Sequence, residues 1–371
     1  MRILSFGDLH FNCGYDEDLI KSVDQIINYV RDHPVNLIAI TGDVYDRSSD
    51  PTSRNVAANK VQLLSEYADV LIVRGNHDSP GDLKILGRLE TGKSIVVDEV
   101  PAIRTFGGVV VHTLPWLTKA RWQALHPEAS RETGDQTVSQ LVLTYLKNSI
   151  DLSEGQKQHV LIGHLTVAGA KAQNHRQMGA DGITVGMYDL KEAGFYAALL
   201  GHIHLRQQVG DDEKFFYNGS IAALDYGETP TKWFSVLDTE LGRVEWVKLD
   251  TIHRQDINVY WTPTGIKAED AIHQDLLKGA RVRANLRVAG GDNVDQAKAQ
   301  LEEFLRQAEV LEFKINPQVV PVMKIRAIEI AKAKSMSAKL GQYWEATEYP
   351  DGATQEDMLS KLSTLEDECS L

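Results

Sequence analysis

Five short apolar runs in this sequence each end in the same kind of polar cluster. With their clusters, the runs read ILSFGDLH, LIAITGDV, VLIVRGNHD, HVLIGHL and AALLGHIH. Apolar runs of this length are typical of buried strands. Between the first three lie segments with apolar residues at helical spacing, DEDLIKSVDQIINYVRDH and SRNVAANKVQLLSEYA. This alternation of strand and helix predicts an α/β sheet domain.

Further strands are expected after these runs. The segments RTFGGVVVHTLP, EKFFYNGS and KWFSVLDTELGRVEWVKL have the pattern of hairpin strands and carry the domain to about residue 250. A chain of 371 residues is long enough for more than one domain.

The polar clusters hold metal-binding side chains. In α/β sheets, ligands bind beyond the carboxyl ends of the strands, so residues distant in sequence can converge there. The clusters together offer seven candidate metal ligands, which are too many for one ion, but a carboxylate such as Asp43 can bridge two ions. Mixed imidazole, carboxylate and amide ligands suit manganese, iron, zinc or magnesium better than copper. Two such ions can clamp a phosphoryl group, which predicts phosphoester hydrolysis. The candidate ligands are Asp8, His10, Asp43, Asn76, His164, His202 and His204.

Composition limits the other possibilities. We expect a cytoplasmic protein that does not contact a membrane, because there is no apolar run of about 18 residues and no signal-like N-terminus. Only Cys13 and Cys369 occur, so neither a disulfide framework nor a thiolate metal site is expected. The net charge of −13 argues against a uniformly basic nucleic-acid binder, but residues 345–371 alone contribute −7. DNA therefore stays possible as a substrate, particularly if cations meet its phosphates.

The series GDLH, GDVYD, GNHD, GH and GHIH resembles the calcineurin-like metallophosphoesterases. In detail it is similar to the SbcD family of nuclease subunits, the bacterial and phage counterparts of the eukaryotic meiotic-recombination-eleven nuclease. The segment YNGSIAALDYGETPTKWF adds to this likeness, because that family has a Tyr-x-Gly-Ser stretch followed by an acid and a lysine. Trp233 stands where the family usually has glycine. The resemblance implies a β-sandwich flanked by helices.

The same resemblance implies roles for the individual residues. It places one manganese ion on Asp8, His10, Asp43 and His204, and a second on Asp43, Asn76, His164 and His202, with magnesium as a possible substitute. His77 would lie beside the metals and support protonation of the leaving group. Asp78 is expected to anchor its loop by accepting backbone N–H bonds.

Asp46 has two readings. A carboxylate close to His77 would favour the imidazolium and raise the pKa of His77 above the reference value of ~6.5, which keeps a general acid available near pH 7. Alternatively, Asp46 caps the helix that follows it.

The remainder of the chain predicts a second, smaller α/β domain and a helical tail. The segments KAEDAIHQDLLKG and NVDQAKAQLEEFLRQA have helical patterns, and ARVRANLRVAG and LEFKINP have strand patterns. In SbcD relatives such a capping domain contacts DNA, and Arg281, Arg283 and Arg287 share one strand face here. They are either phosphate contacts or an ordinary solvated face.

Pro317 and Pro321 predict a linker between the second domain and the tail. The expected division is therefore a nuclease domain at 1–252, a capping domain at 253–316, and a linker with two helices at 317–371. In the SbcD family these helices bind the coiled-coil base of an SbcC-type, SMC-like ATPase. Packing on their own domain is the alternative. The second helix is expected to carry Met358, Leu362 and Leu365 on one apolar face.

Together these features predict a manganese-dependent DNA exonuclease or endonuclease, the nuclease subunit of an SbcCD-like complex that processes double-strand ends. A homodimer is expected through the helices that follow Asp46 and Asp78. Three alternatives are a phosphoprotein phosphatase, which shares the GDVYDR pattern, a small-nucleotide or cyclic-nucleotide phosphodiesterase, and a metal-binding scaffold without activity. Retention of all seven ligands and of His77 argues against the scaffold.

Overall fold

The computed structural model describes most of the chain. The described residues are 1–12, 16–47, 49–125, 138–151, 158–171, 182–228, 231–268, 277–320, 336–337, 339–340 and 354–369. Contacts divide the chain into two compact units. The first contains residues 1–257, 272–284 and 304–314, and the second contains residues 258–271, 285–303 and 315–371.

The first unit contains a sheet built mainly from the N-terminal strands. The strands β1 to β4 are parallel to one another, and β1 pairs antiparallel with β13. In β1, alternate side chains enter different cores: Ile3 faces the second sheet, whereas Leu4 and Phe6 face the helices. In order across this sheet the strands are β14 (Arg243–Leu249), β13 (Lys232–Asp238), β1 (Arg2–Phe6), β2 (Leu37–Ile40), β3 (Asp69–Val73) and β4 (Ile95–Asp98).

A second sheet packs on the first. Its central strands β6, β7, β10 and β12 are parallel, and both edge strands are antiparallel to their neighbours. In order across the sheet the strands are β11 (Gln207–Gln208), β12 (Phe215–Tyr217), β10 (Ala197–Gly201), β7 (His159–His164), β6 (Val109–Leu114) and β5 (Ala102–Phe106). A separate parallel pair is formed by β8 (Thr166–Val167) and β9 (Thr184–Val185).

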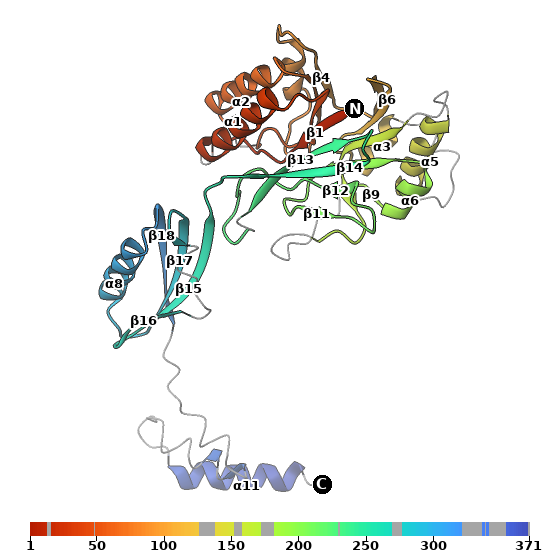
Figure 1. Cartoon of the computed structure of the whole chain (residues 1–371). Helices are drawn as coiled ribbons and strands as arrows, with labels where there is room; N and C mark the ends of the chain where they lie inside the picture. Colours follow the sequence, from red (N-terminus) through yellow and green to blue (C-terminus); the bar gives the residue numbers. More distant parts are fainter. Residues whose placement is uncertain are drawn as a thin grey trace. The chain divides into compact units, whose positions relative to one another are not determined.

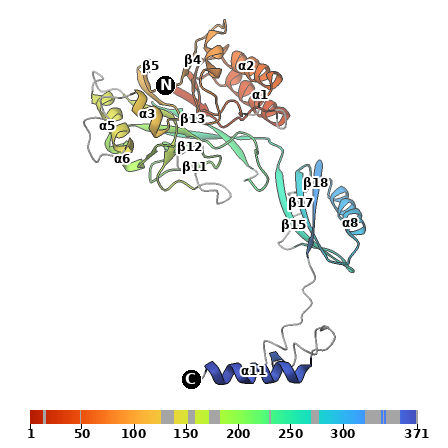
Figure 2. The ribbon, with the colours of Figure 1, turned by 180° about the vertical axis from the view of Figure 1, so that it is seen from behind.

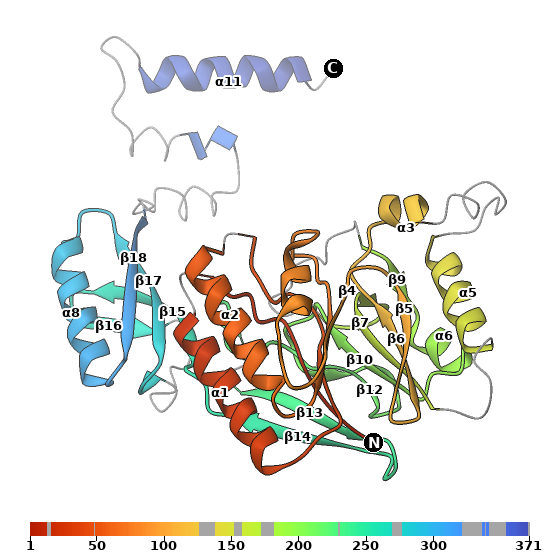
Figure 3. The same cartoon turned by 90° about the horizontal axis from the view of Figure 1, so that it is seen from above.

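Helices cover the outer faces of the two sheets (Figures 1 and 3). On one flank lie α1 (Asp16–Asp32) and α2 (Pro51–Leu64), and on the other lie α3 (Lys119–Leu125), α5 (Val138–Asp151) and α6 (Met187–Glu192). The view from behind in Figure 2 shows the same two flanks. The first unit is therefore a β-sandwich flanked by helices, as the resemblance implied.

Local sequence explains the helices of the first flank. In α1 the residues predicted at helical spacing are buried against the sheet, for example Leu19, Val23 and Ile26. The N-cap of α2 is Asp50, which accepts a hydrogen bond from the Ser53 N–H, and Pro51 follows at the first helical position. A 3₁₀ helix, η1 (Asp82–Arg88), follows the third polar cluster.

A third sheet lies C-terminal to the sandwich. Its order is β16 (Gly265–Ala268), β15 (Arg254–Thr262), β17 (Arg281–Ala289) and β18 (Glu312–Val320), and α8 (Val294–Gln307) lies between β17 and β18 in sequence. In the second unit, Trp261 Nε1 donates to Gln300 Oε1 of α8 at 2.8 Å. The strands predicted in ARVRANLRVAG and LEFKINP and the helix in NVDQAKAQLEEFLRQA are confirmed.

Two details of this region differ from the predictions. The predicted helix that starts at Lys267 overlaps β16 at its first two residues, and residues 269–276 lie outside the described part. The break predicted at Pro317 is wrong, because β18 continues through it to Val320. As an edge strand, β18 leaves alternate N–H groups without a partner in the sheet, so a proline is tolerated there.

Of the two C-terminal helices, the structure describes the second, α11 (Gln355–Cys369). Thr354 caps it, since its Oγ1 accepts from the Asp357 N–H at 3.2 Å. The first lies outside the described residues apart from residues 336–337 and 339–340, as does the side chain of Leu365. Among the described helices, none combines the length and the apolar character that crossing a bilayer requires.

Candidate metal centre

The seven predicted ligand residues lie at the carboxyl ends of five strands. In the first sheet, Asp8 and His10 follow β1, Asp43 follows β2 and Asn76 follows β3. In the second sheet, His164 ends β7, and His202 and His204 follow β10. The strand ends of the two sheets meet closely, because a Cβ on Gly201 would lie only 2.1 Å from the carbonyl oxygen of Thr41. The structure therefore brings together all seven residues.

Four of these residues surround one point. Ligand atoms of Asp8, His10 and His204 all lie within 4.8 Å of one another. The Nε2 atoms of His10 and His204 are 3.2 Å apart, and His10 Nε2 is 3.4 Å from Asp43 Oδ2. This spacing brings two imidazole nitrogens and two carboxylates around one site, the same four residues that the resemblance assigned to the first ion.

The other residues surround a second point. Asn76 Oδ1 lies 2.8 Å from His164 Nε2 and 3.0 Å from His202 Nδ1. Asp43 Oδ2 lies 3.4 Å from His164 Nε2. Asp43 is therefore shared, since one of its oxygens is the same distance from an imidazole nitrogen of each group. The other oxygen, Oδ1, accepts the backbone N–H of His77 at 2.8 Å, which orients the carboxylate.

Several of these atoms are acceptors that face other acceptors. His164 Nδ1 lies 2.8 Å from the carbonyl oxygen of Thr41, which can only accept, so Nδ1 carries a proton. In the neutral ring, Nε2 then has a lone pair, and it points at Asn76 and Asp43. Asp8 Oδ1 accepts the His202 N–H at 2.9 Å, but its Oδ2 is buried with no hydrogen-bond partner among the described residues. Divalent cations fit this donor set, because a cation satisfies all these lone pairs at once.

The electrostatics of the protein groups fit the same interpretation. Burial lowers the pKa of His10 and of His202 to about 3, so both rings are neutral ligands at neutral pH. Burial also opposes protonation of His164, but the charges of Asp43 and Asp8, with hydrogen bonds to Asp43 and to the Thr41 carbonyl, together outweigh it and raise the pKa of His164 to about 9. Against burial, the charges of His164, His10 and His77, with a hydrogen bond from His164, together hold the pKa of Asp43 below its ordinary range. A cation bound beside His164 would release this proton.

The backbone is strained where the ligands lie. Among the described residues other than glycine, positive φ angles occur at Asp8 (52°), His10 (52°), Asp43 (51°), His202 (100°) and Glu309 (54°). Four of these five are proposed ligands, as expected where strain is held at a functional site. The glycines of the motifs allow the close approach: a Cβ on Gly42 would lie 2.3 Å from His164 Nδ1, and one on Gly75 would lie 2.0 Å from Asp43 Oδ1.

Asp78 holds the loop that carries Asn76 and His77. Its Oδ1 accepts the Tyr45 N–H and its Oδ2 accepts the Gly75 N–H, both at 2.9 Å. The predicted role as a loop anchor is confirmed by these bonds. Burial, with the nearby charge of Asp43, raises the pKa of Asp78 to about 7.

His77 lies at the rim of the cluster and faces Asp46. Its Nδ1 is 3.1 Å from Asp46 Oδ1, its ring contacts that of His10 at 4.5 Å between centroids, and its side chain is 38% exposed. Although burial opposes it, the hydrogen bond with His77 helps to hold the pKa of Asp46 below its ordinary value. The cap of α2 is Asp50, so the capping alternative for Asp46 is wrong.

A buried ion pair supports His204 from behind. Glu228 Oε1 is 3.5 Å from His204 Nδ1, and Glu228 Oε2 is 2.6 Å from Lys232 Nζ. Lys232 also donates to Ser220 Oγ at 2.8 Å. Against burial, His204 and Lys232 lower the pKa of Glu228 to about 2. The sequence signal for this pair was the acid and lysine after the Tyr-x-Gly-Ser stretch, but neither residue was predicted to support a ligand.

Two arginines of β17, Arg281 and Arg283, are held in ion pairs. Arg281 pairs with Asp18 and with Glu312, the latter at 3.1 Å. Arg283 Nε donates to Asp256 Oδ1 at 3.1 Å. The alternation along the strand is confirmed, and the ion pairs show that Arg281 and Arg283 are not a plain solvated face. A phosphate contact of these arginines or of the exposed Arg287 stays a prediction.

Comparison with known proteins agrees with the site. A profile of the family described as calcineurin-like phosphoesterase matches residues 1–206. The chain is also similar to the SbcD subunit of the nuclease SbcCD of Staphylococcus epidermidis, with 27% identity over 263 residues. That match covers 65% of this chain and 66% of the relative, just under two thirds of its length.

Solved structures of low sequence identity are also similar. The protein TT1561 of Thermus thermophilus is 12% identical with a TM-score of 0.43, and the match covers 67% of this chain and 99% of that one. Purple acid phosphatase PPD1 from yellow lupin (Lupinus luteus) seeds is 13% identical with a TM-score of 0.43, and the match covers 68% of this chain and 52% of that one.

Proposed function

Because the chain belongs to the calcineurin-like phosphoesterase family, we propose that it is a metal-dependent nuclease that hydrolyses phosphodiester bonds in DNA. The observation that carries this proposal is the position of Asp43 Oδ2, which is 3.4 Å from an imidazole nitrogen of each ligand group. A carboxylate oxygen shared in this way is what a two-cation site requires. The likeness to a nuclease subunit supports DNA as the substrate.

The ligands divide between two sites. Asp8, His10 and His204 would hold one divalent cation, Asn76, His164 and His202 the other, and Asp43 would bridge them. When bound, two cations supply Lewis acidity toward the phosphoryl group and lower the pKa of the attacking water. We propose manganese as the metal, with magnesium as a substitute. Glu228 keeps His204 oriented through Nδ1, so that Nε2 faces the site.

His77 is the proposed general acid. It lies beside the ligands without belonging to either group, and its backbone N–H is already fixed on Asp43. Asp46, 3.1 Å from His77 Nδ1, orients the ring so that Nε2 can deliver a proton to the leaving oxygen. Asp46 is thus a positioning residue, and His77 is the catalytic one.

Other parts of the chain support a role in a complex. We propose that residues 1–252 form the nuclease domain, that residues 253–316 begin a capping domain that extends to Val320, and that the C-terminal helices bind an SbcC-type, SMC-like ATPase. The likeness to an SbcCD subunit supports this partner. A homodimer through α2 and η1 is also proposed, since Ile85 of η1 leaves 59% of its surface exposed. The complex would process double-strand ends in the cytoplasm.

A substrate panel with a metal-ligand variant tests the proposal. Purified protein with manganese is assayed on linear DNA, a phosphopeptide and a nucleoside phosphodiester. We expect DNA to be hydrolysed with the highest kcat/KM, and Asp43→Ala to lose both cations and activity together. Preference for the phosphopeptide would contradict the nuclease proposal, and an Asp43→Ala protein that keeps two cations would contradict the bridging role.

A further inference from the structure

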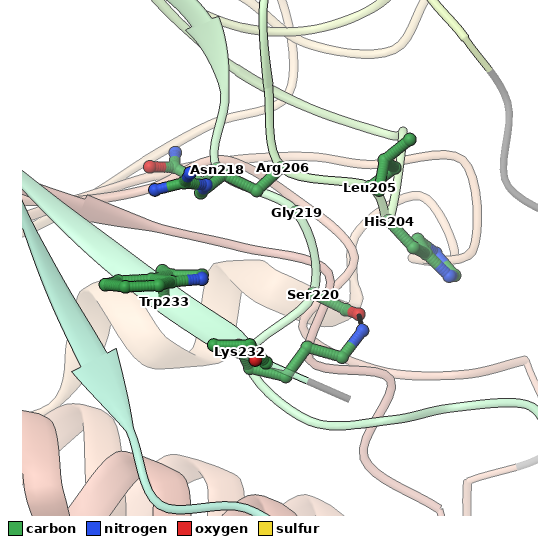
Figure 4. Close-up of a pocket in the computed structure, with 9 residues that line it drawn as sticks. His204, Leu205, Arg206, Asn218, Gly219, Ser220, Lys232 and Trp233 are labelled. Atoms are coloured by element: carbon green, nitrogen blue, oxygen red, sulfur yellow. Dashed lines mark hydrogen bonds between the residues drawn. The ribbon is translucent and has the colours of Figure 1, made fainter. Parts of the chain in front are cut away.

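Arg206 lies between two tryptophans, two residues after the metal ligand His204. Its guanidinium carbon is 4.6 Å from the ring centroid of Trp233 and 4.8 Å from that of Trp246. Figure 4 shows Arg206 next to the ring of Trp233, in the pocket that His204 also lines. Contact with an aromatic face attracts a cation and fixes its orientation.

The register of the β13–β14 hairpin explains the two tryptophans. Trp246 lies opposite Ser235, and Trp233 comes two residues before Ser235. Since side chains alternate along a strand, Trp233 and Trp246 share one face of the hairpin as diagonal neighbours. The ring of Phe216 in β12 packs against Trp246, with 4.8 Å between centroids, which holds it in place. The connection from β10 to β11 places Arg206 against both rings.

Arg206 has no anionic partner within the described part of the chain. Among the described residues, no carboxylate forms an ion pair with it and none accepts a hydrogen bond from its guanidinium. Arg281 and Arg283 of β17, by contrast, are paired with carboxylates. The guanidinium lies over both indole rings, and its N–H donors lie in its own plane.

The pocket is joined to the metal centre by close backbone contacts. Gly219 has a φ of 74°, and a Cβ there would lie 2.6 Å from Arg206 N and 2.8 Å from the His204 carbonyl oxygen. That same oxygen accepts the Ser220 N–H at 3.2 Å. Lys232 forms another wall, and the dashed line in Figure 4 marks its bond to Ser220. These residues enclose about 150 Å³ beside His204.

We propose that Arg206 binds a backbone phosphate of the DNA strand next to the phosphodiester that is cleaved at the metal centre. A planar guanidinium matches a phosphate with two parallel hydrogen bonds, and the tryptophans reduce the orientational freedom that binding would otherwise cost. The pocket is then the path by which the flanking nucleotide leaves the metals. This inference rests on the proposed nuclease function and adds a specific substrate contact to it.

Four full-length proteins test the inference: wild type, Arg206→Ala, Arg206→Lys and Arg243→Ala. Arg243 is an exposed residue of the hairpin that carries the two tryptophans. Its alanine variant also loses one positive charge, so it has the same net charge as Arg206→Ala. Each protein is assayed with manganese on a single-stranded oligonucleotide and on bis(p-nitrophenyl) phosphate, which has no flanking phosphate. The salt dependence of oligonucleotide binding is measured with calcium in place of manganese.

We expect Arg206→Ala to lose about 10-fold to 100-fold in kcat/KM on the oligonucleotide, mainly through a higher KM. The factor by which kcat/KM falls on the small phosphodiester should be at least 5-fold smaller than the factor on the oligonucleotide. The slope of log K against log salt concentration should fall by about 0.7, the value for one phosphate contact to a single strand. Arg243→Ala should behave as wild type. Arg206→Lys keeps a charge but not the planar fork, so it should show an intermediate loss. It also carries the test if the alanine variant does not fold.

The two proposals fail in different ways. Suppose that wild type cleaves the oligonucleotide and that both Arg206 variants match Arg243→Ala in two quantities: the ratio of kcat/KM on the oligonucleotide to kcat/KM on the small phosphodiester, and the salt slope. Then Arg206 binds no phosphate and the inference is wrong. If wild type hydrolyses only the small phosphodiester, the nuclease proposal is wrong, and the contact proposed for Arg206 is wrong with it.

Discussion

The Nδ1 atom of His77 lies 3.1 Å from Oδ1 of Asp46, at the rim of a cluster whose other histidines point inward. The pair thus has a different role from the ligands. We propose that His77 delivers a proton to the leaving oxygen, whereas the seven ligand residues would hold the cations.

The first prediction separates these two roles. His77→Ala should lower kcat about 10²-fold to 10⁴-fold, the usual contribution of proton transfer, and keep two cations per chain. Steady-state kinetics and metal analysis of the same preparation measure both quantities. Unchanged turnover, or loss of a cation, would show that His77 is not the general acid.

A second prediction concerns the buried pair behind His204. In Glu228→Gln the ammonium of Lys232 stays buried without a charged partner, so the free energy of unfolding should fall by about 3–5 kcal/mol. The affinity for one cation should also fall about 10-fold to 100-fold, because the orientation of His204 is lost. Denaturant unfolding and metal titration measure these effects. The matched control is Glu66→Gln, at an exposed residue of the same domain. If both variants behave alike, Glu228 does not support the ligand.

Much of this site could be predicted from the sequence, because each ligand directly follows an apolar run. Glu228 and Lys232 were harder to interpret, since their partner His204 is fixed by a different strand and only the folded chain brings them together. The same holds for Arg206, whose two tryptophans are brought together by the register of a hairpin. Pro317 misled the prediction because its effect depends on whether its strand lies at a sheet edge, which the local sequence does not show.

The third prediction concerns stability at acidic pH. Burial, with a smaller effect of His159, lowers the pKa of His112 to about 4. His112 Nε2 is 2.9 Å from His159 Nδ1, and Ser149 Oγ is 3.0 Å from its other nitrogen. A lowered folded-state pKa gives stability that is fully present above the unfolded pKa of ~6.5 and is lost as the pH falls toward 4.

We therefore expect the unfolding free energy of wild type to fall by about 2 kcal/mol more than that of His112→Asn between pH 7 and pH 5. Chemical denaturation of both proteins in the presence of a chelator gives this difference. Parallel pH profiles of the two proteins would show that His112 does not titrate in this way.

The fourth prediction concerns the C-terminal helices. Met358 and Leu362 of α11 are only partly buried, and covering such side chains stabilises a complex by roughly 1.5–3 kcal/mol each. A chain that ends after Pro321 keeps β18 and should retain its fold and its manganese-dependent activity on single-stranded DNA. It should lose co-purification with the ATPase and ATP-dependent cutting of duplex ends.

The control for that truncation is a chain that ends at residue 311, which also lacks β18 and should lose the fold of the third sheet. If the chain that ends after Pro321 still co-purifies with the ATPase, or unfolds, then the C-terminal helices belong to the core and the partner proposal is wrong.

The central claim is that Asp43 bridges two cations. Anomalous diffraction at the manganese edge, on crystals soaked in manganese, tests it most directly. The structure predicts two peaks about 3.5–4 Å apart, with Asp43 Oδ2 in contact with both, and with His10 and His164 on opposite sides. A single peak, or two peaks of which only one contacts Asp43, would contradict the two-metal account.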